Sequence, residues 1–243
     1  MYTAVYSDVG SVRKANEDSY YVSDFENNNG YVIVADGMGG HKGGQMASKT
    51  AIEEINRTLD FKTVEKMNKE EIEQKIIECV ENANMAVLTK ALSDDSLFGM
   101  GTTLVLCLVI NKVAYIANIG DSRLYVVRDN KMAQVTKDHS VVQMLIDSGE
   151  ITEKEAKNHP NKNVITRAIG SDVKIEADIF YYKIKKNDYI LLCTDGLSNM
   201  VDDSVILDVL TNENSLETAV NRLGQIANKN GGLDNITLAV LKY

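Results

Sequence analysis

Residues 31–41, YVIVADGMGGH, join a run of mostly β-branched residues to Asp36 and a glycine-rich turn. The apolar run predicts a buried strand over residues 31–35. Apolar residues at 47, 51, 52, 55 and 59 predict a helix over residues 44–59. Gly37 lets the backbone come close to an ion, so its carbonyl is a candidate ligand. In isolation, the stretch is equally well explained as a glycine-rich connection whose aspartate caps the helix.

Apolar strands, short turns and a few helices make up most of the remaining chain. Short turns between successive strands indicate antiparallel pairing, and residues 129–131 have the composition of a tight hairpin turn. Helices beside antiparallel strands indicate an α+β layered sandwich. We expect strands over residues 102–110, 112–119, 123–128, 132–136, 178–184, 189–193 and 236–241, and further helices over 69–92, 140–148 and 215–229.

One polar segment interrupts this pattern. Residues 149–170 contain the only proline, Pro160, and two charged or polar clusters, so we expect a surface flap there. Long irregular insertions in compact domains are often functional. Because no stretch has the composition of a linker, residues 1–243 are expected to form a single domain.

Composition narrows the class of protein. The formal net charge of -9 argues against a nucleic-acid or anionic-membrane partner, because no positive field would attract a polyanion. Neither a signal peptide nor an apolar run of about 18 residues is visible, so a cytoplasmic location is expected. The cysteines Cys79, Cys107 and Cys193 show no pairing pattern, and the last two lie in apolar runs where they are expected to fill the core.

Acidic residues in five short signatures point to chemistry. Most of them closely follow an apolar run, and acidic residues at strand ends can converge in space. Clustered carboxylates repel one another unless cations lie between them, and Mg2+ and Mn2+ prefer such oxygen ligands. Apart from Asp36-Gly37, each signature alone is more often a turn or a solvated pair. The signatures centre on Glu17-Asp18, Asp36-Gly37, Asp121, Asp195 and Asp234.

The ordered set of motifs carries more information than any one of them. It consists of Ser7-Asp8-Val9-Gly10 with Arg13 and Asn16-Glu17-Asp18, then Asp36-Gly37-Met38-Gly39-Gly40, Gly101-Thr102-Thr103, Gly120-Asp121-Ser122-Arg123, Asp195-Gly196 and Asp234-Asn235. This set closely resembles the type 2C metal-dependent protein phosphatase (PPM) family in its bacterial form, from about residue 2 to residue 241. The resemblance implies a four-layer α-β-β-α sandwich of two antiparallel sheets flanked by helices, with metals at one edge and a flap near the active site.

The resemblance also implies a role for each matching residue. Asp36 would bridge two Mn2+ or Mg2+ ions, and Arg13 would bind the phosphate. The remaining ligands would be Asp195 and Asp234 at the first ion, the Gly37 carbonyl with Glu17 and Asp18 at the second, and Asp121 with Asp195 at a third, weaker ion. In such a site, a water held between two ions is expected to attack phosphorus without a phosphoenzyme.

The leaving alkoxide needs a proton donor. Eukaryotic members of the family place a histidine directly after the metal-binding Asp-Gly, whereas Met38 stands there in this chain. His41 matches the bacterial Gly-Gly-His pattern, and an ordinary histidine pKa of about 6.5 suits a general acid. An exposed loop histidine explains His41 equally well. The adjacent Asp138-His139-Ser140 is not expected to be a catalytic triad.

The expected function is hydrolysis of phosphoserine and phosphothreonine in proteins, opposing a bacterial serine/threonine kinase, by a monomer. Two alternatives remain open, namely a degenerate phosphatase that only binds and a phosphatase for small metabolites. The intact set of aspartates argues against the first. A nucleotide-binding loop over residues 37–44 is disfavoured, because the glycines do not match either phosphate-binding pattern in register.

Overall fold

The strands with continuous apolar sequences are buried on both faces in the computed structural model. The structure describes the backbone of all 243 residues and every side chain except that of His41. In β3 (Gly30–Ala35), Val32 and Val34 point into the space between two sheets, whereas Ile33 and Ala35 point toward helices. Because successive strand residues face opposite sides, a fully apolar strand must contribute to two cores. This accounts for the missing polar alternation in the sequence.

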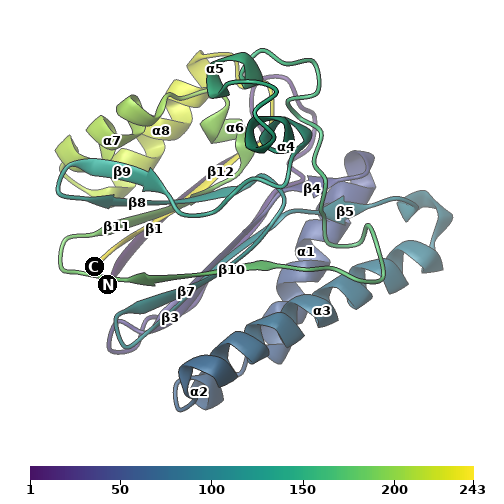
Figure 1. Cartoon of the computed structure of the whole chain (residues 1–243), viewed down its shortest axis with the longest axis horizontal. Helices are drawn as coiled ribbons and strands as arrows, with labels where there is room; N and C mark the ends of the chain where they lie inside the picture. Colours follow the sequence, from purple (N-terminus) through teal and green to yellow (C-terminus); the bar gives the residue numbers. More distant parts are fainter.

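Two five-stranded antiparallel sheets form the centre of the fold (Figure 1). The first sheet has the order β1 (Tyr2–Asp8), β12 (Ile236–Lys242), β11 (Tyr189–Cys193), β8 (Arg123–Arg128) and β9 (Lys131–Gln134). The second has the order β10 (Asp178–Lys183), β7 (Val113–Ile119), β6 (Leu104–Ile110), β3 and β2 (Ser19–Val22).

Helices cover the outer face of each sheet, which confirms the expected four-layer α-β-β-α sandwich. The long helices α1 (Gly40–Thr58) and α3 (Lys69–Ser93) pack on the second sheet. On the first sheet lie α7 (Asp203–Asn212) and α8 (Leu216–Lys229). The shorter helices are α2 (Phe61–Val64), η1 (Asp95–Leu97), α4 (Val141–Asp147), α5 (Glu153–Ala156) and α6 (Asp195–Ser198).

The structure corrects the expectation of one strand over residues 102–110. Gly37–Met38 pairs as β4 with Gly101–Thr102 as β5 in a small separate ribbon. The main strand β6 begins only at Leu104. The interruption falls at Thr103, whose backbone N–H donates to the carbonyl of Asp36 at 2.8 Å. Hydrogen bonding to the residue after β3 therefore replaces regular pairing at this point.

The segment expected to be a flap is mostly irregular and is pinned at its end. It contains α5, with α4 directly before it, and the two helices lie close together at the upper edge of the sandwich in Figure 1. Ile169 pairs with Thr102 through backbone hydrogen bonds of 3.0 and 2.9 Å. The end of the segment is therefore joined to the small β4–β5 ribbon. None of the helices in the described chain is long and apolar enough to span a bilayer.

Candidate metal and phosphate site

Strand ends from both sheets bring the candidate carboxylates to one edge of the sandwich. Three of the aspartates follow a strand: Asp36 follows β3, Asp121 lies two residues after β7, and Asp195 begins α6 just after β11. The other two precede one, with Asp18 directly before β2 and Asp234 two residues before β12. The convergence expected from the sequence is therefore present in the fold.

Burial and mutual repulsion raise the pKa values of four of these carboxyl groups. Burial, then the neighbouring Asp195 and Asp234, raises the pKa of Asp18 to about 7. Burial and the charge of Asp195 raise the pKa of Asp121 to about 7. Burial and Asp234 raise the pKa of Asp195 to about 6. The pKa of Asp36 lies well above its ordinary value, through burial and then the charges of the other four aspartates. A cation among them would relieve this repulsion.

Two buried oxygens in this cluster lack a hydrogen-bond partner, namely Asp18 Oδ1 and Asp195 Oδ1. As the described side chains stand, no three His, Cys, Asp or Glu residues form a ready ligand group for one ion. Two candidate ligands instead contact protein groups, with Asp234 bound to Arg13 and Asp195 to Asn199. All of the candidate ligands are nevertheless oxygen donors, and two of the buried oxygens remain unpartnered. The donor set is thus suited to hard divalent cations.

Two threonines hold the backbone of Asp36. Thr103 Oγ1 accepts from the Asp36 N–H at 2.9 Å, and Thr102 Oγ1 donates to the Asp36 carbonyl at 2.9 Å. The Thr103 hydroxyl also bonds the Ser122 hydroxyl at 2.7 Å, next to Asp121. These three residues are buried. The Gly-Thr-Thr and Gly-Asp-Ser motifs therefore fix the position of the central aspartate, a role that the sequence alone did not reveal.

Asn235 and Thr194 perform a similar task for Glu17 and Asp18. Asn235 Oδ1 accepts from the Glu17 N–H at 2.8 Å, and its Nδ2 donates to the carbonyls of Val9 and Ala15 at 2.9 Å each. Thr194 Oγ1 donates to Asp18 Oδ2 at 3.0 Å. A buried asparagine directly after Asp234 thus links the N-terminal and C-terminal motifs. Its place in the Asp234-Asn235 motif is the sequence signal that marks it.

Gly37 and Gly44 explain why this turn is rich in glycine. A Cβ atom on Gly37 would overlap the carbonyls of Gly44 and Glu17. One on Gly44 would overlap the Glu17 carboxylate. The Glu17 carboxylate and the Gly37 carbonyl therefore both lie against Gly44, near the start of α1. This close approach places Glu17 and Gly37 together, and their role as two ligands of one ion stays a prediction.

Arg13 lies over the acidic cluster. Its Nη2 donates to Asp234 Oδ2 at 2.8 Å, and its side chain is 54% exposed. The hydrogen bond to Asp234, followed by the charges of Asp234, Glu17 and Asp36, raises the pKa of Arg13 further. An exposed guanidinium beside the carboxylates is well placed to receive a phosphate.

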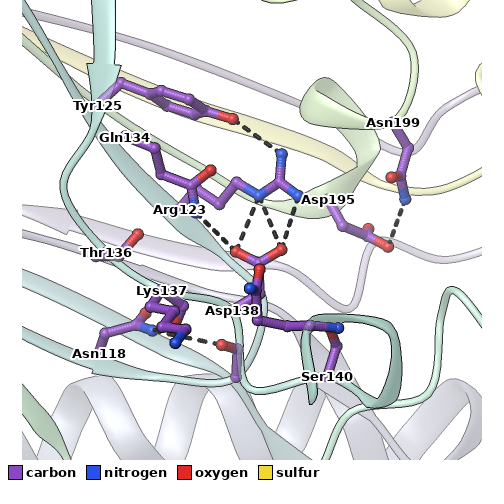
Figure 2. Close-up of polar contacts among 12 residues, drawn as sticks. Asn118, Arg123, Tyr125, Gln134, Thr136, Lys137, Asp138, Ser140, Asp195 and Asn199 are labelled. Carbon is purple, nitrogen blue, oxygen red and sulfur yellow. Dashed lines mark hydrogen bonds and ion pairs between the residues drawn. The ribbon is translucent and has the colours of Figure 1, made fainter. Parts of the chain in front are cut away.

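A second arginine approaches the cluster from within the first sheet. Figure 2 shows Arg123 bonded through Nε and Nη2 to the Asp138 carboxylate, at 2.7–3.0 Å, and through Nη1 to the Tyr125 hydroxyl at 3.0 Å. Its charge lowers the pKa of both Asp121 and Asp195, against the larger effect of burial. Asn199 donates to Asp195 Oδ2 at 3.0 Å. Sequence reasoning assigned no role to Arg123, Asp138 or Asn199.

The three histidines are His41, His139 and His159. His159 lies in the flap, where its Nδ1 accepts from the Asn161 N–H at 3.1 Å. The His41 side chain lies outside the described part of the structure, so its candidate role as a general acid stays a prediction. His139 is buried, accepts from the Gly120 N–H at 3.2 Å and faces Asp178 at 3.2 Å. Because Asp138 faces Arg123 and Ser140 caps α4, the three adjacent residues have separate partners. This confirms that they do not form a triad.

The chain is similar to known proteins along nearly its whole length. The family profile described as "Protein phosphatase 2C" matches residues 11–236. The serine/threonine phosphatase stp of Listeria welshimeri is 38% identical over 242 residues, which cover 100% of this chain and 96% of that protein. Two crystal structures are similar to the present one. The Mycobacterium tuberculosis serine/threonine phosphatase PstP/Ppp has a TM-score of 0.90 at 35% identity, with 100% of this chain and 99% of that chain covered. The PstP catalytic domain in complex with two manganese ions has a TM-score of 0.85 at 34% identity, covering 98% and 96%.

Proposed function

This chain belongs to the protein phosphatase 2C family and is a serine/threonine protein phosphatase, and from that premise we propose that its activity depends on divalent cations held by the aspartate cluster. The observation that carries the proposal is the convergence of five aspartates, four of which, Asp18, Asp36, Asp121 and Asp195, have pKa values raised by burial and by neighbouring aspartates. Two of their buried oxygens lack a partner. The manganese complex of the PstP catalytic domain supports the same conclusion.

The ligands would be distributed as the family resemblance implies. Asp36 would bridge two ions, and Asp195 and Asp234 would complete the first. The second would be held by the Gly37 carbonyl with Glu17 and Asp18, while Asp121 and Asp195 would hold a third, weaker ion. When bound, Mn2+ or Mg2+ supplies Lewis-acid stabilisation of phosphoryl oxygens and an acidified water.

Residues of the chain would orient the substrate around these ions. Arg13 is exposed, so its guanidinium can turn from Asp234 to two phosphoryl oxygens and offset their charge. The threonine contacts to Asp36 keep the central carboxylate in place while charge develops. His41 is the proposed donor of the proton to the leaving serine or threonine oxygen.

We further propose that residues 149–170 act as a flap that influences substrate choice and the third ion. Its end is paired with Thr102, the residue that also bonds the Asp36 carbonyl. Hydrogen bonds from Ile169 to Thr102 and from Thr102 to Asp36 therefore connect the end of the flap to the central aspartate.

The biological setting completes the proposal. Residues 1–243 would act as one phosphatase domain and as a monomer on phosphorylated proteins, opposing a serine/threonine kinase. Cys79, Cys107 and Cys193 are buried free thiols, which supports a reducing, cytoplasmic location.

Hydrolysis of a phosphothreonine peptide by metal-stripped protein tests the proposal. We expect activity to require added Mn2+ or Mg2+, and to fall by at least about a hundredfold in Asp36→Asn. Full activity in the presence of a strong chelator would contradict the proposal. So would an Asp36→Asn variant that keeps wild-type activity at the same Mn2+ concentration.

A further inference from the structure

Two exposed aliphatic side chains flank the Arg13–Asp234 pair. Val12 precedes Arg13 and is 60% exposed, and Leu233 precedes Asp234 and is 56% exposed. Neither belongs to a hydrophobic cluster of the described residues. We call Val12 and Leu233 the apolar rim. A single exposed aliphatic residue needs no explanation, but two beside the candidate phosphate-binding cation form a local surface.

The two loops that carry the rim are locked together. The N–H groups of Ser11 and Val12 both donate to the carbonyl of Gly232, at 2.8 and 3.2 Å. A Cβ atom on Gly10, whose φ is +79°, would overlap the carbonyl of Asp234. Because one carbonyl ties Val12 to the residue before Leu233, the two aliphatic side chains stand on adjacent backbones.

Asn228 adds side-chain contacts that hold these loops. Its Oδ1 accepts from the Ser11 hydroxyl at 3.2 Å, and its Nδ2 donates to Asp8 Oδ1 at 3.1 Å. Asp8 Oδ1 also accepts from the Gly10 N–H at 2.8 Å. The rim is therefore preorganised, and binding to it would require little ordering of the loops.

We propose that the apolar rim binds an aliphatic side chain next to the phosphorylated residue of a protein substrate, and so makes this phosphatase prefer apolar neighbours of phosphothreonine or phosphoserine. The inference rests on the proposed function, in which Arg13 binds the phosphate. Consecutive residues of an extended peptide are spaced by about 3.3–3.6 Å, so a phosphate at Arg13 brings its neighbours over Val12 and Leu233. Burial of an aliphatic group there removes apolar surface of both partners from water.

A set of phosphothreonine peptides tests the inference. Leucine is moved through the two positions on each side of phosphothreonine in an otherwise Gly/Ser sequence, and asparagine replaces it in matched peptides. At one position or more, we expect kcat/KM for the leucine peptide to exceed that for the asparagine peptide by about five- to thirtyfold. In the double variant Val12→Ser, Leu233→Ser, the ratio should fall below about threefold, mainly through a higher KM.

The controls separate recognition from catalysis and folding. Hydrolysis of p-nitrophenyl phosphate, which has no neighbouring residues, should change by less than about twofold in the double variant. The matched double variant Leu92→Ser, Val205→Ser replaces the same residue types, exposed on α3 and α7. It should keep the leucine preference of the wild type.

Each outcome has a definite meaning. Hydrolysis of all peptides at equal rates by the wild type would overturn the inference and leave the proposed function intact. The same holds for a leucine preference that survives in the rim variant. No hydrolysis of any phosphopeptide by the Mn2+-supplied wild type would overturn the proposed function itself, and the inference with it.

Discussion

Arg13 bonds Asp234, although the family resemblance assigns the arginine to phosphate and the aspartate to a metal. In the structure, the guanidinium supplies the positive charge beside Asp234. The backbone beside Arg13 is anchored to Gly232, so only its side chain is free to turn away. A cation and Arg13 would therefore compete for the same carboxylate oxygen.

We expect Arg13→Ala to have opposite effects on two ligands. Mn2+ binding should tighten by about two- to fivefold, because an exposed ion pair that competes for Asp234 is worth up to about 1 kcal/mol. Affinity for inorganic phosphate in the presence of Mn2+ should fall, because a charge-assisted hydrogen bond is lost. Isothermal titration calorimetry of both ligands measures the two effects.

Arg222→Ala is a matched control for this prediction. Arg222 has a side chain 55% exposed, against 54% for Arg13, and bonds Glu213 away from the acidic cluster. It should change neither affinity. Unchanged or weaker Mn2+ binding in Arg13→Ala would contradict the competition.

Thr103 provides a second test at the residue scale. Thr103→Val keeps the shape but leaves the Asp36 N–H and the Ser122 hydroxyl without this partner. We expect a loss of about 1–3 kcal/mol in the free energy of unfolding and a fall of about tenfold or more in kcat/KM. Denaturant titration and phosphopeptide hydrolysis measure the two effects.

Thr136→Val separates stability from catalysis. Thr136 is also buried, and its hydroxyl accepts from the Leu124 N–H at 2.9 Å. The control should lose similar stability with little change in activity. Equal losses of activity in both variants would show that Thr103 acts only through the stability of the fold.

At the scale of elements, the flap joins the small β4–β5 ribbon. Replacement of residues 150–163 by a short Gly/Ser linker leaves the Ile169–Thr102 pairing in place. We expect hydrolysis of p-nitrophenyl phosphate to persist. The differences in kcat/KM among phosphopeptides should become smaller, and the Mn2+ concentration needed for half-maximal activity should rise. A deletion that leaves both selectivity and Mn2+ dependence unchanged would refute the proposed role.

The elements differ in how well the sequence predicted them. Central strands such as β3 and β11 were predicted because both of their faces are apolar. The start of α8 was also predicted, and Ser215 does accept from the Thr218 N–H. The strand β1 was missed, because it lies at a sheet edge and its residues alternate only weakly between buried and exposed. The break at Thr103 depends on a partner 67 residues away, which no local pattern contains.

In the candidate site, too, local patterns were predictable from the sequence and long-range contacts were not. Residue types and motif order were enough to select the carboxylates, because each aspartate lies next to a strand end. The contacts that hold them were not predictable, since Asn235 bonds Glu17 and Val9, which lie 218 and 226 residues before it in the sequence. Arg123 was likewise visible in its motif, but its pairing with Asp138 is formed only by the fold.

At the scale of the whole molecule, the acidic cluster links stability to pH. In the unfolded chain the aspartates titrate near 3.9, whereas burial and repulsion raise the folded pKa values of Asp18 and Asp195 to about 7 and about 6. Between the unfolded value of about 3.9 and the folded values of about 6 and about 7, the folded state therefore binds more protons than the unfolded state. The free energy of unfolding falls as the pH rises through this range. Below pH 4 both states are protonated, so this contribution is fully present there.

We expect metal-stripped protein to lose thermal stability from pH 5 to pH 7.5, and added Mn2+ to raise Tm more at pH 7.5 than at pH 5. The lowered pKa of buried His139 acts in the opposite direction, since it favours folding as pH rises. Asp195→Asn should therefore flatten the loss of stability, while His139→Gln should steepen it. Differential scanning calorimetry with and without Mn2+ measures these slopes. An Mn2+ effect on Tm that is independent of pH would contradict this link.

The central claim is that the aspartate cluster holds the divalent cations on which the phosphatase depends. Equilibrium dialysis of metal-stripped protein against Mn2+, without substrate, tests it most directly. We predict two ions per chain in the wild type and in Asp202→Asn, a control aspartate whose exposed partner is Lys157. In Asp36→Asn, affinity should fall by at least about a hundredfold. No bound Mn2+ in the wild type, or equal binding in Asp36→Asn, would contradict the claim.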